Sequence, residues 1–451
     1  MIRFLRTLWK DRRGNAIIIA GAALPIVVGG AGLATDTIQW VLWKRELQRA
    51  ADSAAMAAVY AEAENSVNTS AESVSSSVTA DLAKNNNHTG NSLLTGYPQI
   101  AYPANTGVAT NSVQVTLAIQ KTLGFSSLFL KTAPTITASA TAAMVPGLNP
   151  CAIGLAQNTA SVIIGGSSTT NLGCPVMANS TLCPAVTTNG SSYSFTAPKV
   201  AAAGCLPSSI TGVTTLLPHY LQQKDPFAGK YSTAVPSGMT CKNTSQMNYT
   251  TTTGTGQNKV TYNHLKAGCY SGNFKITGGT YYLDPGVYYI DSGDFDTTGG
   301  TNLIGTQSPD LGTNKNGVTF VLTGTSPGSI KMNGSSDLQL YAPTSSNCGS
   351  NTEGGVSVNS CNYTDMLFIQ SSSASLNNSN IVQGDNSSVF DGAFYLPDGQ
   401  VTFSGSSSAS TKCAMVIGYT LQFSGNTALQ NNTTGCYANT TATIQVVKLI
   451  G

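Results

Sequence analysis

The residues of this chain that could carry out chemistry are few and widely separated. The densest group of acids is Asp291, Asp294 and Asp296, and Asp284 lies shortly before it. Carboxylates this close in a loop could bind Ca²⁺, but their spacing is not that of an EF-hand. We therefore interpret them as exposed turn aspartates and predict no metal site. The three histidines share a polar, loop-like context and have no close partner in sequence: His88, His219 and His264.

Enzyme motifs give little support for catalysis. The sequence has no His-Glu-x-x-His helix and no Gly-Lys-Ser phosphate loop. Polysaccharide-cleaving β-helices place acids and a base along one sheet, and only 9% of this chain is charged. We predict no catalytic residue and no cofactor.

The ten cysteines indicate a different chemistry. None lies before position 151, and none forms a Cys-x-x-Cys motif. An even number of such cysteines predicts structural disulfides in an oxidising compartment. Neighbours such as Cys348–Cys361 and Cys413–Cys436 are candidate pairs, although the sequence leaves the connectivity open. The candidates are Cys151, Cys174, Cys183, Cys205, Cys241, Cys269, Cys348, Cys361, Cys413 and Cys436.

The N-terminal end has the pattern of a membrane anchor. A basic head, residues 1–13, precedes residues 14–35, which carry no ionisable side chain. At about 1.5 Å per residue the apolar run spans roughly 30 Å, one bilayer core. The basic head predicts a cytoplasmic N-terminus and an exported remainder. A cleaved secretory signal ending near Gly32–Ala34 is the alternative. The residues assigned to the anchor are Gly14, Asn15, Leu24, Pro25, Gly32 and Asp36.

A helical pattern continues over residues 36–64. Arg45, Arg49 and Asp52 lie on one face, and an alanine-rich apolar stripe lies on another. Trp40 and Trp43 follow the apolar run, where interfacial indoles are common. We predict that the apolar stripe docks on partner helices; a simple stalk is the alternative. Its residues are Leu47, Ala50, Ala51, Ala54, Ala55 and Ala58.

Four short motifs follow one another along this N-terminal region. They are an Arg-Arg-Gly-Asn entry at 12–15, an aliphatic run broken by Leu24-Pro25, a Gly-Leu-Ala-x-Asp exit at 32–36, and a Leu-Gln-x-Ala-Ala-Asp-x-Ala-Ala-x-Ala-Ala run at 47–58. Together they resemble the N-terminal module of the TadG-like proteins of bacterial tight-adherence (Flp) pilus assembly. The resemblance implies an inner-membrane location and pilin-like and other pilus-assembly proteins as partners.

Two departures limit this resemblance. Related pseudopilins are cut after a glycine and carry glutamate at the fifth mature residue. With cleavage after Gly14 that residue would be Ile19, so the resemblance does not imply processing there. Some TadG-like proteins carry a von Willebrand factor A domain with an Asp-x-Ser-x-Ser motif, and this sequence has none.

Residues 65–147 predict a pilin-like stalk and small sheet. Residues 113–119 alternate strictly between apolar and polar, as in a half-buried strand. The runs Leu123–Leu130 and Thr135–Met144 could each supply another strand, and Asn85–Asn87 indicate a loop. A long helix followed by a small antiparallel sheet is the outline of a pilin-like fold.

Residues 148–451 predict a Ser/Thr/Asn/Gly-rich, disulfide-containing β domain. A pattern of apolar, any, apolar, small polar, Gly begins at Phe274, Ile330, Val401 and Leu421, and Asp284-Pro285-Gly286 indicates a turn between two strands. Short strands ending at Gly or Asn favour a β-solenoid, a right-handed parallel β-helix with uneven coils. A β-sandwich or barrel is the alternative if the strands pair antiparallel. The fold class is thus mainly β with a long N-terminal α-helix.

These features favour a structural function. With a net charge of +2 and no basic groove, we expect no nucleic-acid partner. We expect a non-catalytic membrane-anchored component of tight-adherence pilus assembly or anchoring. A surface adhesin that binds glycans or host surfaces is the second hypothesis, and a β-helix carbohydrate-active enzyme is the third.

Overall fold

The helical pattern at the N-terminus forms one helix, α2 (Arg12–Val67), in the computed structural model. The structure describes residues 12–67, 73–89, 92–166, 169–190, 193–208, 210–312, 314–332, 334–353, 355–383, 387–404, 408–412, 415–424, 427–432 and 442–450. The chain divides into unit 1, Met1–Pro146 with Val446–Gly451, and unit 2, Gly147–Gln445.

Unit 1 combines helices with a small sheet. Its other elements are α3 (Val74–Thr89), β1 (Gln99–Ala101), β2 (Thr110–Gln120), the 3₁₀-helix η1 (Ser126–Leu128), β3 (Thr135–Leu148) and β31 (Ile444–Leu449). The sheet order is β1-β2-β3-β31, and β2 pairs antiparallel with both β1 and β3. The expected small antiparallel sheet is therefore present, and Val113, Val115, Leu117 and Ile119 are buried on it.

Three details of unit 1 differ from the sequence analysis. The run 123–130, expected as a strand, forms a loop with η1, because its apolar residues follow no alternating pattern. Residues Asn85–Asn87, expected as a loop, lie in α3. Residues 446–451, which we placed with the β domain, join unit 1 because β31 extends its sheet beside β3.

Unit 2 contains three ladders of parallel strands. Ladder A comprises β13 (Gly268–Ser271), β16 (Gly286–Asp291), β19 (Val318–Thr323), β24 (Met366–Gln370), β27 (Ala393–Phe403), β29 (Val416–Phe423), β4 (Ala152–Gly154), β7 (Val176–Ala178) and β9 (Ser194–Ala202). Ladder B comprises β14 (Phe274–Lys275), β17 (Phe295–Asp296), β20 (Ile330–Lys331), β25 (Asn378–Val382), the later parts of β27 and β29, β5 (Val162–Gly165) and β8 (Val186–Asn189). Ladder C comprises β12 (Val260–Leu265), β15 (Thr280–Leu283), β18 (Asn302–Ile304), β21 (Leu338–Tyr341), β26 (Val389–Asp391), β28 (Ser408–Lys412), β30 (Thr427–Asn432), β6 (Thr169–Leu172) and the start of β9.

This parallel pairing is compatible with the expected solenoid and differs from the antiparallel pairing on which a sandwich would depend. The turn Asp284-Pro285-Gly286 joins β15 to β16, as predicted. The recurring pattern also has a structural meaning, because its copies stack in ladder B. Phe274 is in register with Phe295 and then Ile330, and Val401 is in register with Leu421. The four copies of the pattern therefore lie at equivalent positions in ladder B.

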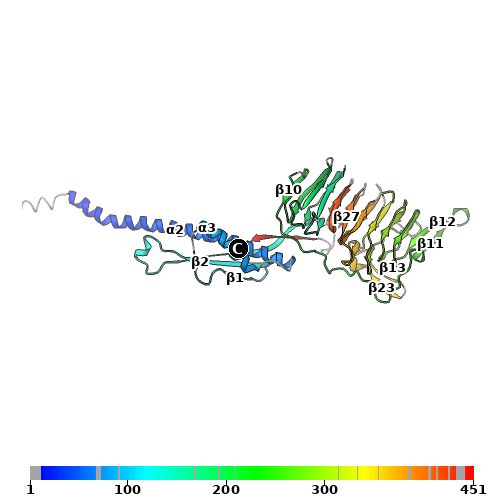
Figure 1. Cartoon of the computed structure of the whole chain (residues 1–451), viewed down its shortest axis with the longest axis horizontal. Coiled ribbons are helices and arrows are strands. Elements are labelled where there is room, and N and C mark those ends of the chain that lie inside the picture. The colour runs from blue at the N-terminus through cyan, green and yellow to red at the C-terminus, as the bar shows by residue number, and fades with distance from the viewer. Residues whose placement is uncertain are drawn as a thin grey trace, which may run out of the picture. The chain divides into compact units, whose positions relative to one another are not determined.

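The order of the strands in space is not their order in sequence. The late strands β29 and β30 pair with the early strands β4, β5 and β6, and Figure 1 shows the orange and red strands between the early and middle ones. The chain leaves the early strands through β10 (Val213–Leu217), which pairs with β9. It enters the other end through β11 (Asn248–Thr253), which forms an antiparallel hairpin with β12.

The segment between these two ends, residues 218–242, is hereafter the strap. It covers the outer face of ladder A, where Phe227 packs with Tyr289, Val321 and Ile369 in one buried cluster. The Tyr395 hydroxyl donates to Asp225 Oδ2 at 2.7 Å, which ties the strap to β27. Ladder A strands are therefore buried on both faces, which explains their continuous apolar runs.

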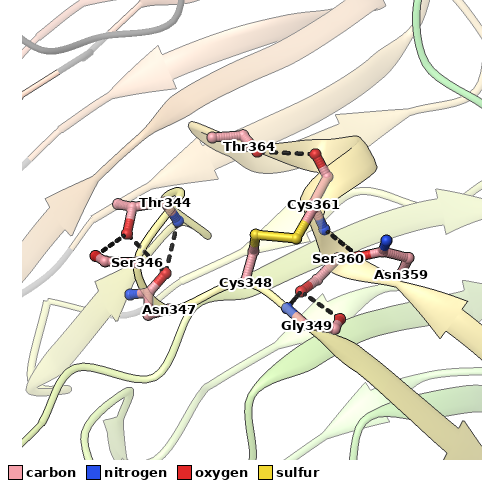
Figure 2. The surroundings of a disulfide bond; sticks show 9 residues. All are labelled: Thr344, Ser346, Asn347, Cys348, Gly349, Asn359, Ser360, Cys361 and Thr364. Carbon is pink, nitrogen blue, oxygen red and sulfur yellow. Dashed lines mark hydrogen bonds between the residues drawn. A yellow bond between two sulfur atoms is a disulfide. The ribbon is translucent and has the colours of Figure 1, made fainter.

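A disulfide-closed hairpin lies beside the strap. It comprises β22 (Ser350–Glu353), β23 (Val356–Asn359) and η3 (Ser360–Tyr363). Figure 2 shows the Cys348–Cys361 bond at its base, next to the Ser360 hydroxyl that donates to Gly349 O at 3.0 Å. The Tyr363 hydroxyl donates to Ser232 O of the strap at 2.8 Å.

Candidate functional site

The N-terminal half of α2 presents an apolar surface. In unit 1 its large apolar side chains are exposed from Ile19, at 67%, to Leu42, at 53%. Thr35 and Thr37 donate their hydroxyls to the carbonyls of Ala31 and Leu33, so the helix satisfies these polar groups itself. The helix is long and apolar enough to cross a membrane, and it fits a single-pass anchor.

The residues assigned to the anchor occupy different settings. Leu24 is exposed, and α2 continues through Pro25. Gly32 faces the ring of Phe125, where an added Cβ would lie 2.4 Å from ring atoms. Gly14 and Asn15 lie in α2, but their side chains are outside the described set.

Asp36 is the one ionisable side chain between Gly14 and Trp43, and it is only 4% exposed. Its carboxylate accepts the backbone N–H of Phe125 at 3.0 Å and that of Ser126. These donors belong to the start of η1, in the loop between β2 and β3. The loop therefore covers the single charge of this apolar stretch.

The alanine-rich face expected to dock on partners is used inside unit 1. Leu47 is 4% exposed, Ala50 is 6% exposed, and Ala51, Ala54, Ala55 and Ala58 are fully buried. α2 packs there against α3 and β2. Alanine suits this role because its small side chain lets the helix approach the sheet closely. Docking of this face on a partner helix stays a prediction.

The edge of β3 that does not pair with β2 holds α2 against the sheet. Ile450 N–H, just after β31, donates to Thr141 O at 2.9 Å, Gln48 Nε2 donates to Ser139 O at 2.9 Å, and Lys44 Nζ donates to Thr137 O. A strand and then two helix side chains thus bind successive carbonyls along one edge.

The cysteines pair locally within unit 2. The disulfides are Cys151–Cys174, Cys183–Cys205, Cys241–Cys269 and Cys348–Cys361. The candidate pair Cys348–Cys361 is confirmed, whereas Cys413 and Cys436 lie outside the described residues. Cys241–Cys269 joins the end of the strap to β13, and Lys242 forms an ion pair with Glu353 of the neighbouring hairpin.

The aspartates considered for calcium make other contacts. Asp294 pairs with Lys331 at 2.5 Å and Asp296 pairs with Lys275 at 3.5 Å, each across neighbouring strands. Among the described residues, no group of three His, Cys, Asp or Glu side chains could hold a metal ion.

The sequence analysis misjudged His264, which lies in β12 and is 2% exposed. Its Nε2 is 2.9 Å from Thr251 Oγ1, and its Nδ1 is 3.8 Å from Asp284 Oδ1. Burial and the nearby Asp284 raise the pKa of Tyr249, which stacks on the imidazole, to about 12. Because His264 is shielded from solvent, we interpret its contacts with Thr251, Tyr249 and Asp284 as structural. They hold the β11–β12 hairpin at the end of the ladders.

One further motif was missed. Gly324–Gly328 has the Gly-x-Ser-x-Gly spacing, with Ser326 exposed. It leads into strand β20 and not into a helix, so it lacks the context of a nucleophile elbow.

A cavity of about 370 Å³ opens between the strap and ladder A. Its lining includes Tyr231, Tyr395, Tyr419, Asp225 and Asp398. Burial, together with the neighbouring Asp225, raises the pKa of Asp398. Asp398 Oδ2 is buried without a hydrogen-bond partner among the described residues.

The comparisons with known proteins bear on the helix of unit 1. Residues 14–62 match the family model Tad, Flp pilus-assembly TadE/G-like. The TadG-like resemblance is thereby confirmed for this segment. The TadE/G-like segment starts within the apolar run and ends within the alanine-rich part of α2, so it covers both the exposed and the buried halves of the helix. No curated protein and no solved structure matches the chain.

Proposed function

We propose that this chain is a non-catalytic, membrane-anchored structural component of a tight-adherence (Flp) pilus assembly system. The observation that carries the proposal is the coincidence of the TadE/G-like match, residues 14–62, with a helix that is apolar and exposed in its first half and packed in its second. We place the N-terminus in the cytoplasm and unit 2 on the periplasmic or outer side of the inner membrane. The disulfides support an oxidising compartment for unit 2.

We further propose that unit 2 is a β-solenoid, a right-handed parallel β-helix. The support is the parallel pairing of successive strands in each of three ladders. Such a stack is a rigid, elongated unit, and its shape suits a projecting structural part.

We add the polar face of α2 as a proposed partner surface, because the alanine face already packs against α3 and β2. Arg45 and Arg49 are both exposed on α2. Charge reversal at both positions should reduce recovery of pilin-like and other pilus-assembly proteins after mild crosslinking in the native envelope. Lys84→Glu, at an exposed position on α3 of the same unit, is the matched control.

The readout is mass spectrometry of proteins that copurify with the full-length chain. Recovery of pilus-assembly proteins with the wild type and with Lys84→Glu, but not with the Arg45→Glu/Arg49→Glu variant, supports the proposal. Purification of the wild-type chain without any pilus-assembly protein contradicts it.

The cavity under the strap favours one second candidate, a glycan-binding adhesin. Tyrosine rings beside carboxylates suit sugars, whose apolar faces stack on rings and whose hydroxyls donate to oxygen. Asp398→Asn and Tyr419→Ala should then weaken binding of the full-length chain to a glycan array, whereas Arg45→Glu should not. An array without any bound glycan argues against this candidate.

A further inference from the structure

The loop between β2 and β3 carries an exposed apolar surface at a particular place. Leu128 and Phe129 are each 74% exposed and Leu130 is 50% exposed, in the run expected to be a strand. Large apolar side chains gathered at a loop tip are uncommon on a water-exposed surface and mark an interaction site. Among the described residues of unit 1, none covers these three side chains.

The loop lies against the apolar half of α2. A Cβ built on Gly32 would lie 2.4 Å from the Phe125 ring, and one built on Gly29 would lie 3.9 Å from it. Gly29 lies inside the apolar run, six residues or about 9 Å along the helix before Thr35. Figure 1 shows the loop, in cyan, alongside α2. The loop therefore reaches the same level as the membrane-spanning residues.

The contact with Asp36 explains why the loop takes this position. A carboxylate at the edge of a bilayer is costly unless it is hydrogen-bonded. The backbone N–H groups of Phe125 and Ser126 supply these hydrogen bonds. A loop held on Asp36 must bring its tip to the membrane boundary, because Leu33 on one side and Ile38 on the other are exposed apolar residues of the same helix.

We propose that residues 123–130 form a second membrane contact, which dips into the outer leaflet beside α2 and partitions Leu128, Phe129 and Leu130 into lipid. Lys121 and Lys131 flank the loop, and their long side chains can keep their ammonium groups in the headgroup layer while the loop tip enters lipid. The contact would fix the tilt and rotation of unit 1 on the membrane, which a lone helix leaves free. The inference rests on the proposed membrane anchorage.

The test places one environment-sensitive fluorophore on the full-length protein, reconstituted at high dilution in vesicles that carry nitroxide quenchers on the acyl chains. The labelled positions are Phe129→Cys in the loop, Ile26→Cys in the helix as the anchorage control, and Val108→Cys as the control outside the membrane. Val108 is 70% exposed and lies just before the start of β2, at the end of that strand away from the loop. We expect most of the fluorescence to be lost at positions 26 and 129 and little at position 108.

Two substitutions in the helix test the link between loop and membrane. Gly32→Leu displaces the Phe125 ring and should restore much of the fluorescence at position 129. Gly30→Leu is the matched control, because an added Cβ there meets nothing within 4 Å. Neither change should alter quenching at position 26.

The possible results separate the two proposals. Quenching at position 26 without quenching at position 129 overturns the loop contact and leaves the anchorage intact. Absence of quenching at position 26 contradicts the anchorage itself. If position 129 is shielded in the native envelope but not in vesicles of pure lipid, its occupant is a protein, and the lipid contact is likewise overturned.

Discussion

The helix contact of unit 1 and the central column of ladder A in unit 2 are filled with side chains of very different size. Where α2 meets the rest of unit 1, the fully buried residues include Ala51, Ala54 and Ala55. In unit 2 the central column of ladder A consists of rings: Tyr288, Phe320, Phe368 and Phe394 follow one another in register. Their successive ring centroids are 5.0, 5.0 and 5.2 Å apart.

The alanine contact and the ring column gain stability from buried side chains in two different ways. Alanines bury little area each, so the helix contact in unit 1 depends on close fit and on the hydrogen bonds that α2 makes to β3. Rings bury much more area and also contact each other favourably when stacked about one strand spacing apart. We therefore expect unit 2 to be sensitive to side-chain removal and unit 1 to be sensitive to side-chain enlargement.

The largest effect should come from shortening a ring in the column. Phe320→Ala should lower the free energy of unfolding of unit 2 by about 3–5 kcal/mol, because it leaves a ring-sized cavity. Circular dichroism of the β signal during urea unfolding measures the loss. Leu128→Ala, at a 74% exposed position of unit 1, should leave this transition unchanged. Equal losses in both variants would contradict the role given to the column.

A comparable effect should follow removal of the bond that ends the strap. Cys241→Ser with Cys269→Ser opens a link across 28 residues and should lower the free energy of unfolding by about 3–4 kcal/mol. Limited proteolysis should then cut the strap between residues 218 and 242. The pair Cys348→Ser with Cys361→Ser spans 13 residues and should cost about 0.5–1 kcal/mol less. A strap that stays uncut in the first variant would show that ladder A holds it without the disulfide.

A smaller effect of the opposite kind is expected in unit 1. Ala54→Leu adds volume at a fully buried position and should lower the free energy of unfolding by about 1–3 kcal/mol. Trp40 and Trp43 lie in α2 and no tryptophan follows them, so their fluorescence reports α2 separately from the β signal. Ala34→Leu, exposed on the same helix, is the matched control. A neutral Ala54→Leu variant would show that this contact tolerates a larger side chain.

Periodicity was enough to predict much of the fold. The alternation at residues 113–119 predicted β2, and the pattern starting at Phe274, Ile330, Val401 and Leu421 marked strands that share ladder B. The pairing of late strands with early ones was not predictable, because no local pattern records which strands lie next to each other. The strap was missed for the same reason, although the apolar runs Val287–Ile290 and Val318–Leu322 indicate strands buried on both faces.

The features of the candidate site that depend on neighbouring residues in sequence were predictable. The apolar run and its basic head indicated the anchor, and the TadE/G-like motifs were recognisable in residues 12–58. The role of Asp36 was not, because its partners lie 89 and 90 residues away. His264 was misjudged for a similar reason, since its burial depends on Tyr249 and Asp284, which other strands bring to it.

The smallest predicted effect concerns the stability of the β11–β12 hairpin at alkaline pH. Burial first, and then Asp284, raise the pKa of Tyr249 from its ordinary 10 to about 12, so folding favours the protonated phenol. This contribution to stability is fully present below about pH 10 and is lost as the pH rises through about 12. Hydrogen exchange of residues 248–265 should therefore accelerate between these values relative to ladder A. Tyr249→Phe keeps the ring on His264 but removes the titrating group, so the pH-dependent part of the acceleration should shrink. An identical pH dependence in the variant would assign the effect to other tyrosines, such as Tyr270 and Tyr288, whose pKa values burial also raises.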